Sequence, residues 1–446
     1  MVSRIVIAGF GSAGYAALMA IKRNDPKAEI TVIDPKERDL MHPCGIPYSL
    51  ENIVEEEGLL QDIGLSRMNV QKVRARGLRI DTDNKIIFSE DGSDSFETPY
   101  DTAILATGYR PFIPPVPGLD RFMGNGVYTL ASVKDLKMVR RYIGNKKTGI
   151  VVGGGAIGIE AAVALKEHCG TVTLIEMKDQ LLPGVIDDDI SKLLEENLKA
   201  HGIDVLLSTA VDEFTGRDNF SGVSAGGASV AGDLCILAAG FRANTALAEK
   251  SGIECTPNGI VVDTALRTSK DSVFAAGDCI SAWSVIDGKT TGAKLATSAY
   301  KQGTVAGLNA SGGAAGYRGT AGTFVTRAGN IEIAGTGYTT AIAREHGYDP
   351  VSGKIKSGIL PEYFPGGTEI TVKVIFDKTT GKLLGAQGAG ERGAAERVNV
   401  ISTAIEFDIP VTELPRIEMA YCPAVSEVYD PLLRAVDFGL RRMKRS

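Results

Sequence analysis

The stretch RIVIAGFGSAGYAALMAIK, residues 4–22, decides the fold of the N-terminal part of this chain. A short β-branched run leads into a Gly-rich turn and then into a helix of small residues. Three glycines fit G-x-G-x-x-G, whose members make a tight turn, admit a pyrophosphate to the backbone and let helix pack on strand: Gly9, Gly11 and Gly14. The next strand, EITVID, ends at Asp34, where a carboxylate can accept hydrogen bonds from ribose hydroxyls. The stretch therefore predicts a dinucleotide site.

The same pattern recurs in TGIVVGGGAIGIEAAVALKEHCGTVTLIEM, residues 148–177. Its glycines are Gly153, Gly155 and Gly158, and its acid, Glu176, ends the following strand. Two such units indicate two dinucleotides, or one cofactor and one cosubstrate. An acid at position 176 favours a free ribose 2′-hydroxyl, and hence NADH over NADPH, although the nearby Lys178 weakens that preference.

Composition narrows the class of protein. A chain of 446 residues suggests roughly three domains. The net charge of −6 argues against a nucleic-acid partner, since phosphate binding needs a basic face. The six cysteines form no C-x-x-C pair and there are four histidines, so we predict neither a metal site nor a disulfide scaffold. No apolar run reaches the ~20 residues of a membrane span. The N-terminus runs straight into a strand, and we expect a cytoplasmic protein.

Four further stretches complete a longer pattern. They are YDTAILATGYRPFIPPVPGLD with its A-T-G-x-x-P sequence, DLCILAAGFRANTALAEKSGIE, SVFAAGDCISA and GAKLATSAYKQGTVAGLNASGG. In motif order, spacing and length, the chain resembles the two-dinucleotide-binding flavoprotein disulfide reductases over nearly its whole length.

The resemblance implies an α/β fold with two Rossmann-like dinucleotide-binding domains and an α+β C-terminal dimerisation domain. It implies FAD in the first unit and NADH or NADPH in the second, in a homodimer with active sites shared between subunits. The FAD domain would be split into residues 1–112 and 246–322. The NAD(P)H domain would cover 113–245, and the dimerisation domain 323–446.

The resemblance also implies which residues hold the cofactors. Asp278 would bind the ribityl chain of the flavin, residues 294–297 would lie near the flavin ring, and Glu160 would lie beside the nicotinamide. Besides the glycines and acids of the two Gly-rich units, the candidate cofactor-binding residues are Ala13, Pro35, Ala106, Thr107, Gly108, Arg110, Ile157, Gly240, Ala296 and Thr297.

A lone cysteine, Cys44, stands in LMHPCGIPYSL. Most members of the family carry C-x-x-x-x-C, but the second position here is Ser49, so no internal disulfide forms there. CGIPY is similar to the single-cysteine branch: coenzyme A disulfide reductases, NAD(P)H persulfide reductases, and NADH oxidases and peroxidases. Pro47 suits the first turn of a helix that we expect to include YSLENIVEEE. Cys44 would then lie at the N-terminus of that helix, where the dipole lowers the pKa of a thiol.

Other positions bear on the substrate. The oxidases and peroxidases typically carry a histidine where this chain has Ser12, which argues against oxygen or peroxide as the main acceptor. Tyr363 and Tyr421 match tyrosines that the reductases supply from the partner subunit, and a phenol there can protonate a leaving thiolate. Cys422 departs from the family pattern, and either resolves Cys44 of the other subunit or is an ordinary interface residue.

The sequence thus predicts a flavoprotein NAD(P)H:disulfide oxidoreductase that acts on a low-molecular-weight disulfide, such as coenzyme A disulfide, or on a persulfide. The catalytic candidates are Cys44, Tyr363, Tyr421 and Cys422. Two alternatives stay open: an NADH oxidase, and a flavoprotein electron carrier that reduces a protein partner.

Overall fold

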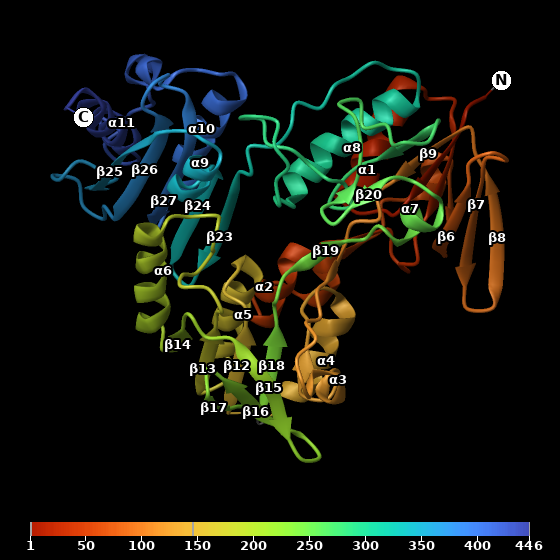
Figure 1. Ribbon diagram of the computed structural model, residues 1–446, viewed down its shortest axis with the longest axis horizontal. Coiled ribbons are helices and arrows are strands. Elements are labelled where there is room, and N and C mark those ends of the chain that lie inside the picture. Colours follow the sequence, from red (N-terminus) through yellow and green to blue (C-terminus); the bar gives the residue numbers. More distant parts are fainter. Residues whose placement is uncertain (1, 145–146, 446) are drawn as a thin grey trace. The chain divides into compact units, whose positions relative to one another are not determined.

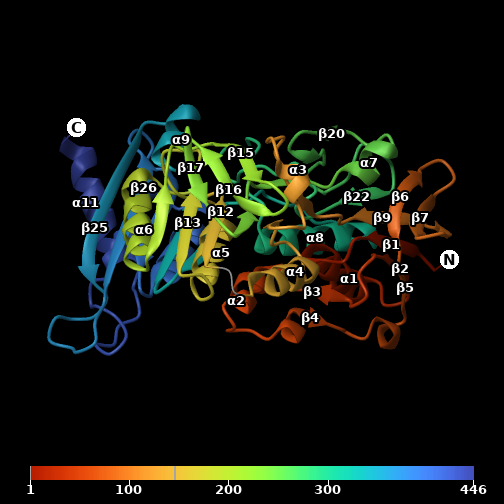
Figure 2. The same ribbon diagram turned by 90° about the horizontal axis from the view of Figure 1, so that it is seen from below.

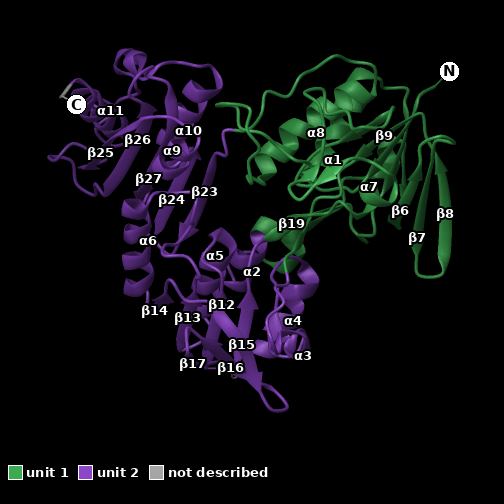
Figure 3. Cartoon of the chain, viewed as in Figure 1, with its two compact units in different colours: residues 1–44, 55–112, 241–320 green, residues 45–54, 113–240, 321–446 purple. Residues whose placement is uncertain are grey.

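The chain forms two compact units (Figure 3). The computed structural model describes residues 2–144 and 147–445. Unit 1 comprises residues 1–44, 55–112 and 241–320, and unit 2 comprises residues 45–54, 113–240 and 321–446. Each unit therefore gathers segments that are far apart in the sequence.

The centre of unit 1 is a five-stranded parallel sheet in the order β22-β9-β1-β2-β5. Its strands are β1 (Arg4–Ala8), β2 (Glu29–Ile33), β5 (Val70–Val73), β9 (Thr102–Leu105) and β22 (Val273–Ala275). Helices α1 (Ser12–Asn24) and α8 (Ala296–Ala310) lie side by side in both views (Figures 1 and 2). Their approach is close because α8 presents Gly303, where a Cβ atom would lie 2.1 Å from the carbonyl oxygen of Ala13.

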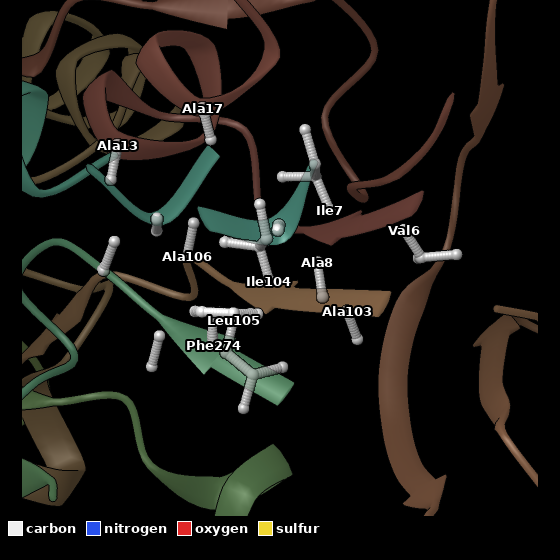
Figure 4. Close-up of a cluster of buried hydrophobic side chains, with 14 of the residues drawn as sticks. Val6, Ile7, Ala8, Ala13, Ala17, Ala103, Ile104, Leu105, Ala106 and Phe274 are labelled. Atoms are coloured by element: carbon white, nitrogen blue, oxygen red, sulfur yellow. The ribbon is translucent and has the colours of Figure 1, made fainter. Parts of the chain in front are cut away.

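Neighbouring strands of this sheet supply the core of unit 1. Figure 4 shows Val6, Ile7 and Ala8 of β1 beside Ile104 and Leu105 of β9. All five are almost fully removed from water. Parallel strands with helices on their faces read as continuous apolar runs, and RIVIA and TAIL are such runs.

Smaller elements complete unit 1. An antiparallel sheet contains β6 (Arg76–Asp81), β7 (Ile86–Asp91) and β8 (Asp94–Pro99). Three short pairs follow: β3 (Leu40–Met41) with β4 (Leu60–Gln61), β10 (Tyr109–Pro111) with β19 (Phe241–Ala243), and β20 (Cys255–Thr256) with β21 (Gly259–Ile260). Helix α7 (Ala246–Lys250) and the short helices η2 (Glu56–Leu59) and η3 (Leu65–Met68) fill the connections.

Unit 2 repeats the same design. Its parallel sheet has the order β11-β18-β12-β13-β14. The strands are β11 (Val127–Tyr128), β12 (Thr148–Val152), β13 (Thr171–Ile175), β14 (Ile203–Leu206) and β18 (Leu234–Leu237). The helices are α2 (Ile46–Leu50), α3 (Leu119–Phe122), α4 (Val133–Ile143), α5 (Ala156–Lys166) and α6 (Asp188–Ala200), and the antiparallel sheet is β15 (Val211–Gly216), β16 (Phe220–Ala225) and β17 (Ala228–Ala231). Each Gly-rich turn thus follows the middle strand of an equivalent sheet.

The C-terminal part of unit 2 is an antiparallel sheet in the order β23-β24-β27-β26-β25. Its strands are β23 (Phe324–Ala328), β24 (Ile331–Gly337), β25 (Pro350–Gly358), β26 (Glu369–Asp377) and β27 (Leu383–Gly390). The accompanying helices are α9 (Thr340–Glu345), α10 (Ala394–Glu406), η4 (Val411–Arg416) and α11 (Pro431–Arg445). The predicted fold class is confirmed: two Rossmann-like sheets and an α+β C-terminal domain.

No helix in the described ranges 2–144 and 147–445 is long and apolar enough to cross a membrane.

Candidate active site

The first Gly-rich turn joins β1 to α1. Gly9 has a φ of 96°, and a Cβ atom there would lie 2.3 Å from the carbonyl oxygen of Ala106. Gly14 lets α1 approach, since its Cβ would lie 2.3 Å from the carbonyl oxygen of Gly9. No heavy atom comes within 4 Å of the corresponding position at Gly11, which is the N-cap of α1 and has no side-chain cap. Open space therefore adjoins uncapped N–H groups at the start of a helix.

The second turn, between β12 and α5, has the same geometry. Gly153 has a φ of 112°, and its Cβ would lie 2.3 Å from the carbonyl oxygen of Ala238. Gly158 packs against Gly153, and Gly155 is the uncapped N-cap of α5 with nothing within 4 Å. Both turns fit the pyrophosphate of a dinucleotide, because each combines free backbone donors with room for a ligand.

The two acids that follow the Gly-rich turns, Asp34 and Glu176, both accept hydrogen bonds from backbone N–H groups. The carboxylate of Asp34 accepts the N–H of Phe10 at 2.7 Å and that of Lys36 at 2.9 Å. Glu176 accepts the N–H of Gly154 at 2.6 Å and that of Lys178 at 2.7 Å. Each carboxylate thereby braces its own Gly-rich turn. Asp34 also accepts a hydrogen bond from the ammonium group of Lys36 at 2.6 Å. Since a carboxylate has about four acceptor sites, each acid still keeps capacity for a ribose hydroxyl.

The remaining cofactor candidates lie on the elements that flank the two turns. Gly108 and Gly240 follow β9 and β18, have φ values of 67° and 102°, and face open space. Thr107 donates its hydroxyl to the carbonyl of Asn244 at 2.6 Å. The others are placed as follows: Ala106 after β9, Ala13 in α1, Ile157 in α5, Pro35 after Asp34, Arg110 exposed on β10, and Ala296 and Thr297 exposed at the start of α8.

Asp278 lies just past the carboxyl end of β22, at the edge where ligands bind in parallel sheets. The N–H of the preceding Gly277 donates to the side-chain oxygen of the buried Gln302 at 2.8 Å, which fixes the turn. Desolvation raises the pKa of Asp278, and the charge of Lys294 opposes that rise. Within the described part of the chain no hydrogen bond reaches this carboxylate. A polar ligand group, such as a flavin hydroxyl, fits it.

Cys44 is exposed in the single-turn helix η1 (Pro43–Gly45). Burial raises the pKa of Tyr109 to about 12, and the charges of Asp278 and Cys44 contribute to that rise. Tyr109 is therefore within electrostatic range of both groups. The ring of Tyr109 packs edge-on against Phe241, with centroids 4.3 Å apart. Within unit 1, the structure thus brings Cys44, Tyr109 and Asp278 together.

The expected long helix after Cys44 is wrong. Helix α2 has five residues and ends at Leu50, although Pro47 does lie in its first turn. Asn52 adopts a left-handed φ of 62°, and the N–H of Ile53 donates back to the carbonyl of Tyr48 at 2.9 Å. This is a helix-ending motif in which asparagine is well suited to the left-handed position. A five-residue helix carries little dipole, so it gives weak support for a lowered thiol pKa at Cys44.

Ser49, where most of the family has its second cysteine, is fully buried. A guanidinium nitrogen of Arg140 in α4 lies 2.5 Å from the Ser49 carbonyl oxygen and 3.2 Å from its hydroxyl. The imidazole of His168 lies 2.6 Å from the carbonyl oxygen of Leu50. Two side chains therefore hold the C-terminal carbonyls of α2, and the Ser49 hydroxyl is part of that anchor.

Glu160, in the second turn of α5, is bound by two neutral hydroxyls. Thr326 donates to its carboxylate at 2.7 Å, and Tyr48 at 3.5 Å. Desolvation raises the pKa of Glu160; these hydrogen bonds oppose the rise and the charge of Glu51 adds to it. Burial raises the pKa of Tyr48 to about 12, so its hydroxyl stays protonated and remains a donor.

A pH dependence of stability follows from Glu160. Because its pKa is raised in the folded protein, its contribution to stability is complete below the ordinary glutamate pKa and is lost as pH rises through the folded pKa. We expect Glu160→Gln to raise the melting temperature at pH 8 by about 1–3 °C and to change it little at pH 4. Thermal unfolding of the holoenzyme across this range checks the sign, and an equal gain at both pH values would contradict it.

In the C-terminal domain the two predicted tyrosines meet. The hydroxyls of Tyr363 and Tyr421 lie 3.3 Å apart, and both side chains are exposed. The hydrogen bond with Tyr363 raises the pKa of Tyr421. Cys422 is exposed next to them, whereas Cys169, Cys235 and Cys279 are buried. Tyr363, Tyr421 and Cys422 belong to unit 2, whereas Cys44 belongs to unit 1.

Tyr109 and Gln302 are among the residues of these sites that were not predicted from the sequence. Tyr109 follows the A-T-G stretch and lies on β10, which pairs with the distant β19, and the charge of Cys44 contributes to the raised pKa of Tyr109. Gln302 lies within α8, where nothing in the local pattern distinguishes it from a surface glutamine.

Duplicated parallel sheets, each with a Gly-rich turn and a bracing acid, and an antiparallel C-terminal domain define an NAD(P)H-dependent flavoprotein oxidoreductase. The chain belongs to the pyridine nucleotide-disulphide oxidoreductase family: residues 3–303 match its main model and residues 325–432 match its dimerisation domain. FAD and NAD(P)H are the cofactors typical of this family. The dimerisation domain supports a homodimer.

Similar proteins include both reductases and oxidases. An NADH oxidase of Methanocaldococcus jannaschii is 34% identical over 99% of both chains. An NAD(P)H coenzyme A polysulfide/persulfide reductase of Pyrococcus horikoshii is 30% identical over 97% of both. Among solved structures, the NAD-dependent persulfide reductase from A. fulgidus superposes with a TM-score of 0.95 at 30% identity, over 99% of this chain and 84% of that one.

Proposed function

We propose that this protein is an FAD-dependent NAD(P)H:disulfide oxidoreductase that reduces a low-molecular-weight disulfide, such as coenzyme A disulfide, or a persulfide, through Cys44. The carrying observation is that Cys44 is exposed, whereas Ser49, five positions further along the chain, is buried and accepts a hydrogen bond from Arg140 on its hydroxyl. An exposed thiol with no second cysteine at that position suits exchange with a small external sulfur compound. The persulfide reductase names of similar proteins support this substrate class.

The assignment of the cofactors is part of the proposal. The turn at Gly9–Gly14 would hold FAD in a domain made of residues 1–112 and 246–322. The turn at Gly153–Gly158 would hold NAD(P)H in a domain of residues 113–245, and residues 323–446 would form the dimer. Two observations support this assignment: the open space at both uncapped helix starts, and the carboxylate of Asp278, to which no described residue donates a hydrogen bond.

The proposed reaction balances as one NAD(P)H, one proton and one disulfide giving NAD(P)⁺ and two thiols. The Cys44 thiolate attacks one sulfur of the disulfide, the S–S bond breaks, and the first thiol leaves as thiolate. The mixed disulfide on Cys44 then takes up two electrons and a proton, releasing the second thiol and restoring the thiolate. Bound FAD supplies the relay that carries those electrons from NAD(P)H.

Proton delivery falls to the tyrosine pair. A leaving thiolate needs a donor, and the hydrogen-bonded phenols of Tyr363 and Tyr421 offer one at the surface of the C-terminal domain. We assign them to the active site of the second copy in the dimer. Cys422 is the alternative residue there, as a resolving thiol for the Cys44 of the other copy.

An NADH oxidase is the second candidate, because the M. jannaschii relative carries that name at 34% identity. The two candidates separate in one experiment with the purified holoenzyme. NADH consumption is measured without oxygen in the presence of coenzyme A disulfide, and then in air without it. Anaerobic turnover with two thiols formed per NADH supports the reductase. Fast oxygen uptake and no anaerobic turnover would overturn it in favour of the oxidase.

Nucleotide preference gives a further prediction. Glu176 is buried beside its Gly-rich turn, and its charge would repel a ribose 2′-phosphate. Glu176→Gln keeps the shape and removes the charge, so we expect the ratio of kcat/KM for NADPH over NADH to rise about tenfold, equivalent to ~1.4 kcal/mol. Asp218→Asn, an exposed change of equal charge in the same unit, is the control. An unchanged ratio in Glu176→Gln would exclude this role.

A further inference from the structure

Unit 1 contains a half-buried ammonium group to which the cofactor assignment gives no role of its own. Lys294 precedes α8, and its Nζ atom donates to the carbonyl oxygens of Ile280 at 2.5 Å and Asn258 at 3.0 Å. Both acceptors are neutral. An ammonium group has three N–H donors, so these two carbonyls leave one donor without an acceptor in the described part of the protein.

The carboxylate whose charge acts on Lys294 is that of Asp278, two residues before Ile280. Desolvation lowers the pKa of Lys294, and the charge of Asp278 opposes that shift. Desolvation likewise raises the pKa of Asp278, and Lys294 opposes it. The two charges interact, but no hydrogen bond joins them. A buried charge is normally hydrogen-bonded to an opposite charge, because a buried charge with incomplete hydrogen bonding costs free energy.

Both groups lie where a ligand of a parallel sheet binds. Asp278 follows β22 at its carboxyl end, and Lys294 stands immediately before the start of α8, whose N-cap Leu295 provides no side-chain cap. The uncapped helix start adds positive potential of the same sign as Lys294. A suitable ligand would bring hydroxyl donors for the carboxylate of Asp278 and a group that gains negative charge for the ammonium group of Lys294.

We propose that Lys294 is an electrostatic positioning residue for the flavin: its ammonium group, held by two carbonyls next to Asp278, raises the reduction potential of the bound cofactor. The proposal rests on the assignment of FAD to unit 1. Reduction adds negative charge to the cofactor, and a fixed cation within a low-dielectric site favours that charge. Lys294 therefore tunes how readily the enzyme accepts electrons from NAD(P)H.

The test uses the holoenzyme and its midpoint potential, measured by equilibration with a reference dye. Lys294→Gln keeps N–H donors for Ile280 and Asn258 but removes the charge. We expect the equilibrium constant for reduction of the flavin to fall at least tenfold. For a two-electron couple this shifts the midpoint potential by about 30 mV to more negative values. Lys294→Arg should keep the potential of the wild type, and Lys27→Met, an exposed charge change beyond α1, should leave it unchanged.

Each possible result either supports the proposed role of Lys294 or overturns it. A drop in Lys294→Gln that Lys294→Arg restores supports the proposal, and so does loss of FAD from the Gln variant that the Arg variant reverses. A wild-type potential in Lys294→Gln overturns it. Failure of the Arg variant to restore a lost potential or lost FAD also overturns it. Wild-type protein that does not bind FAD would instead overturn the assignment of the flavin itself.

Discussion

Cys44→Ser is expected to abolish turnover with disulfides and persulfides, with a loss of at least about 10³-fold in kcat. A serine hydroxyl is not ionised at neutral pH and does not form a mixed disulfide, so the acceptor half of the reaction has no nucleophile. NADH should still reduce the cofactor in this variant at nearly the wild-type rate, because Cys44 acts after that step. Rapid mixing with NADH, then with coenzyme A disulfide, measures the two halves separately.

The matched control is Cys255→Ser, which removes a half-buried thiol from β20 of the same unit. Its rates should equal those of the wild type. A spectroscopic readout accompanies the kinetics: a thiolate in contact with oxidised flavin gives long-wavelength absorbance, which should be present in the wild type and absent in Cys44→Ser. Acceptor reduction that survives the loss of Cys44 would exclude the thiol mechanism and favour an electron carrier for a protein partner.

Cys422→Ser answers a separate question. If Cys422 resolves the mixed disulfide on Cys44, its loss should trap that adduct and slow turnover, which mass spectrometry of the quenched enzyme detects. If it is an interface residue, turnover stays at the wild-type level. Its exposure next to Tyr421 makes both outcomes compatible with the structure of the single chain.

Local chemistry made the dinucleotide turns predictable from the sequence. Gly9 and Gly153 need a positive φ and a close approach to a neighbouring strand, and no other residue meets both demands without strain. The acids Asp34 and Glu176 follow at a spacing set by one helix and one strand. The repeat of the whole unit then predicted the duplicated sheets.

The features that could not be predicted from the sequence depend on contacts between residues that are far apart in the chain. The helix after Cys44 was predicted too long because its acidic, helix-forming stretch hid the left-handed turn at Asn52. Neither the anchor of Ser49 by Arg140, 91 residues away, nor the contact of Glu160 with Thr326, 166 residues away, has a local signal. Such contacts arise from packing between elements, which no single stretch encodes.

The second large loss of activity is expected when the hydroxyls of the tyrosine pair are removed. In a hydrogen-bonded pair of phenols one hydroxyl donates to the other, and the second is left to donate outward. Tyr363 and Tyr421 should therefore act as one proton-delivering unit. We expect Tyr363→Phe and Tyr421→Phe each to lower kcat with disulfide about 10²-fold, with cofactor reduction by NADH unaffected.

The double variant discriminates between a shared role and two separate packing roles. If the pair works as a unit, Tyr363→Phe with Tyr421→Phe should lose scarcely more than the worse single variant, since either change already breaks the chain of donors. Independent effects would multiply to about 10⁴-fold. Tyr429→Phe is the control: this exposed hydroxyl donates at 2.5 Å to Asp437 and has no place in the proposed proton path, so its kcat should match the wild type. Wild-type kcat in both single variants would remove the tyrosines from the mechanism and leave the protonation of the leaving thiol to solvent.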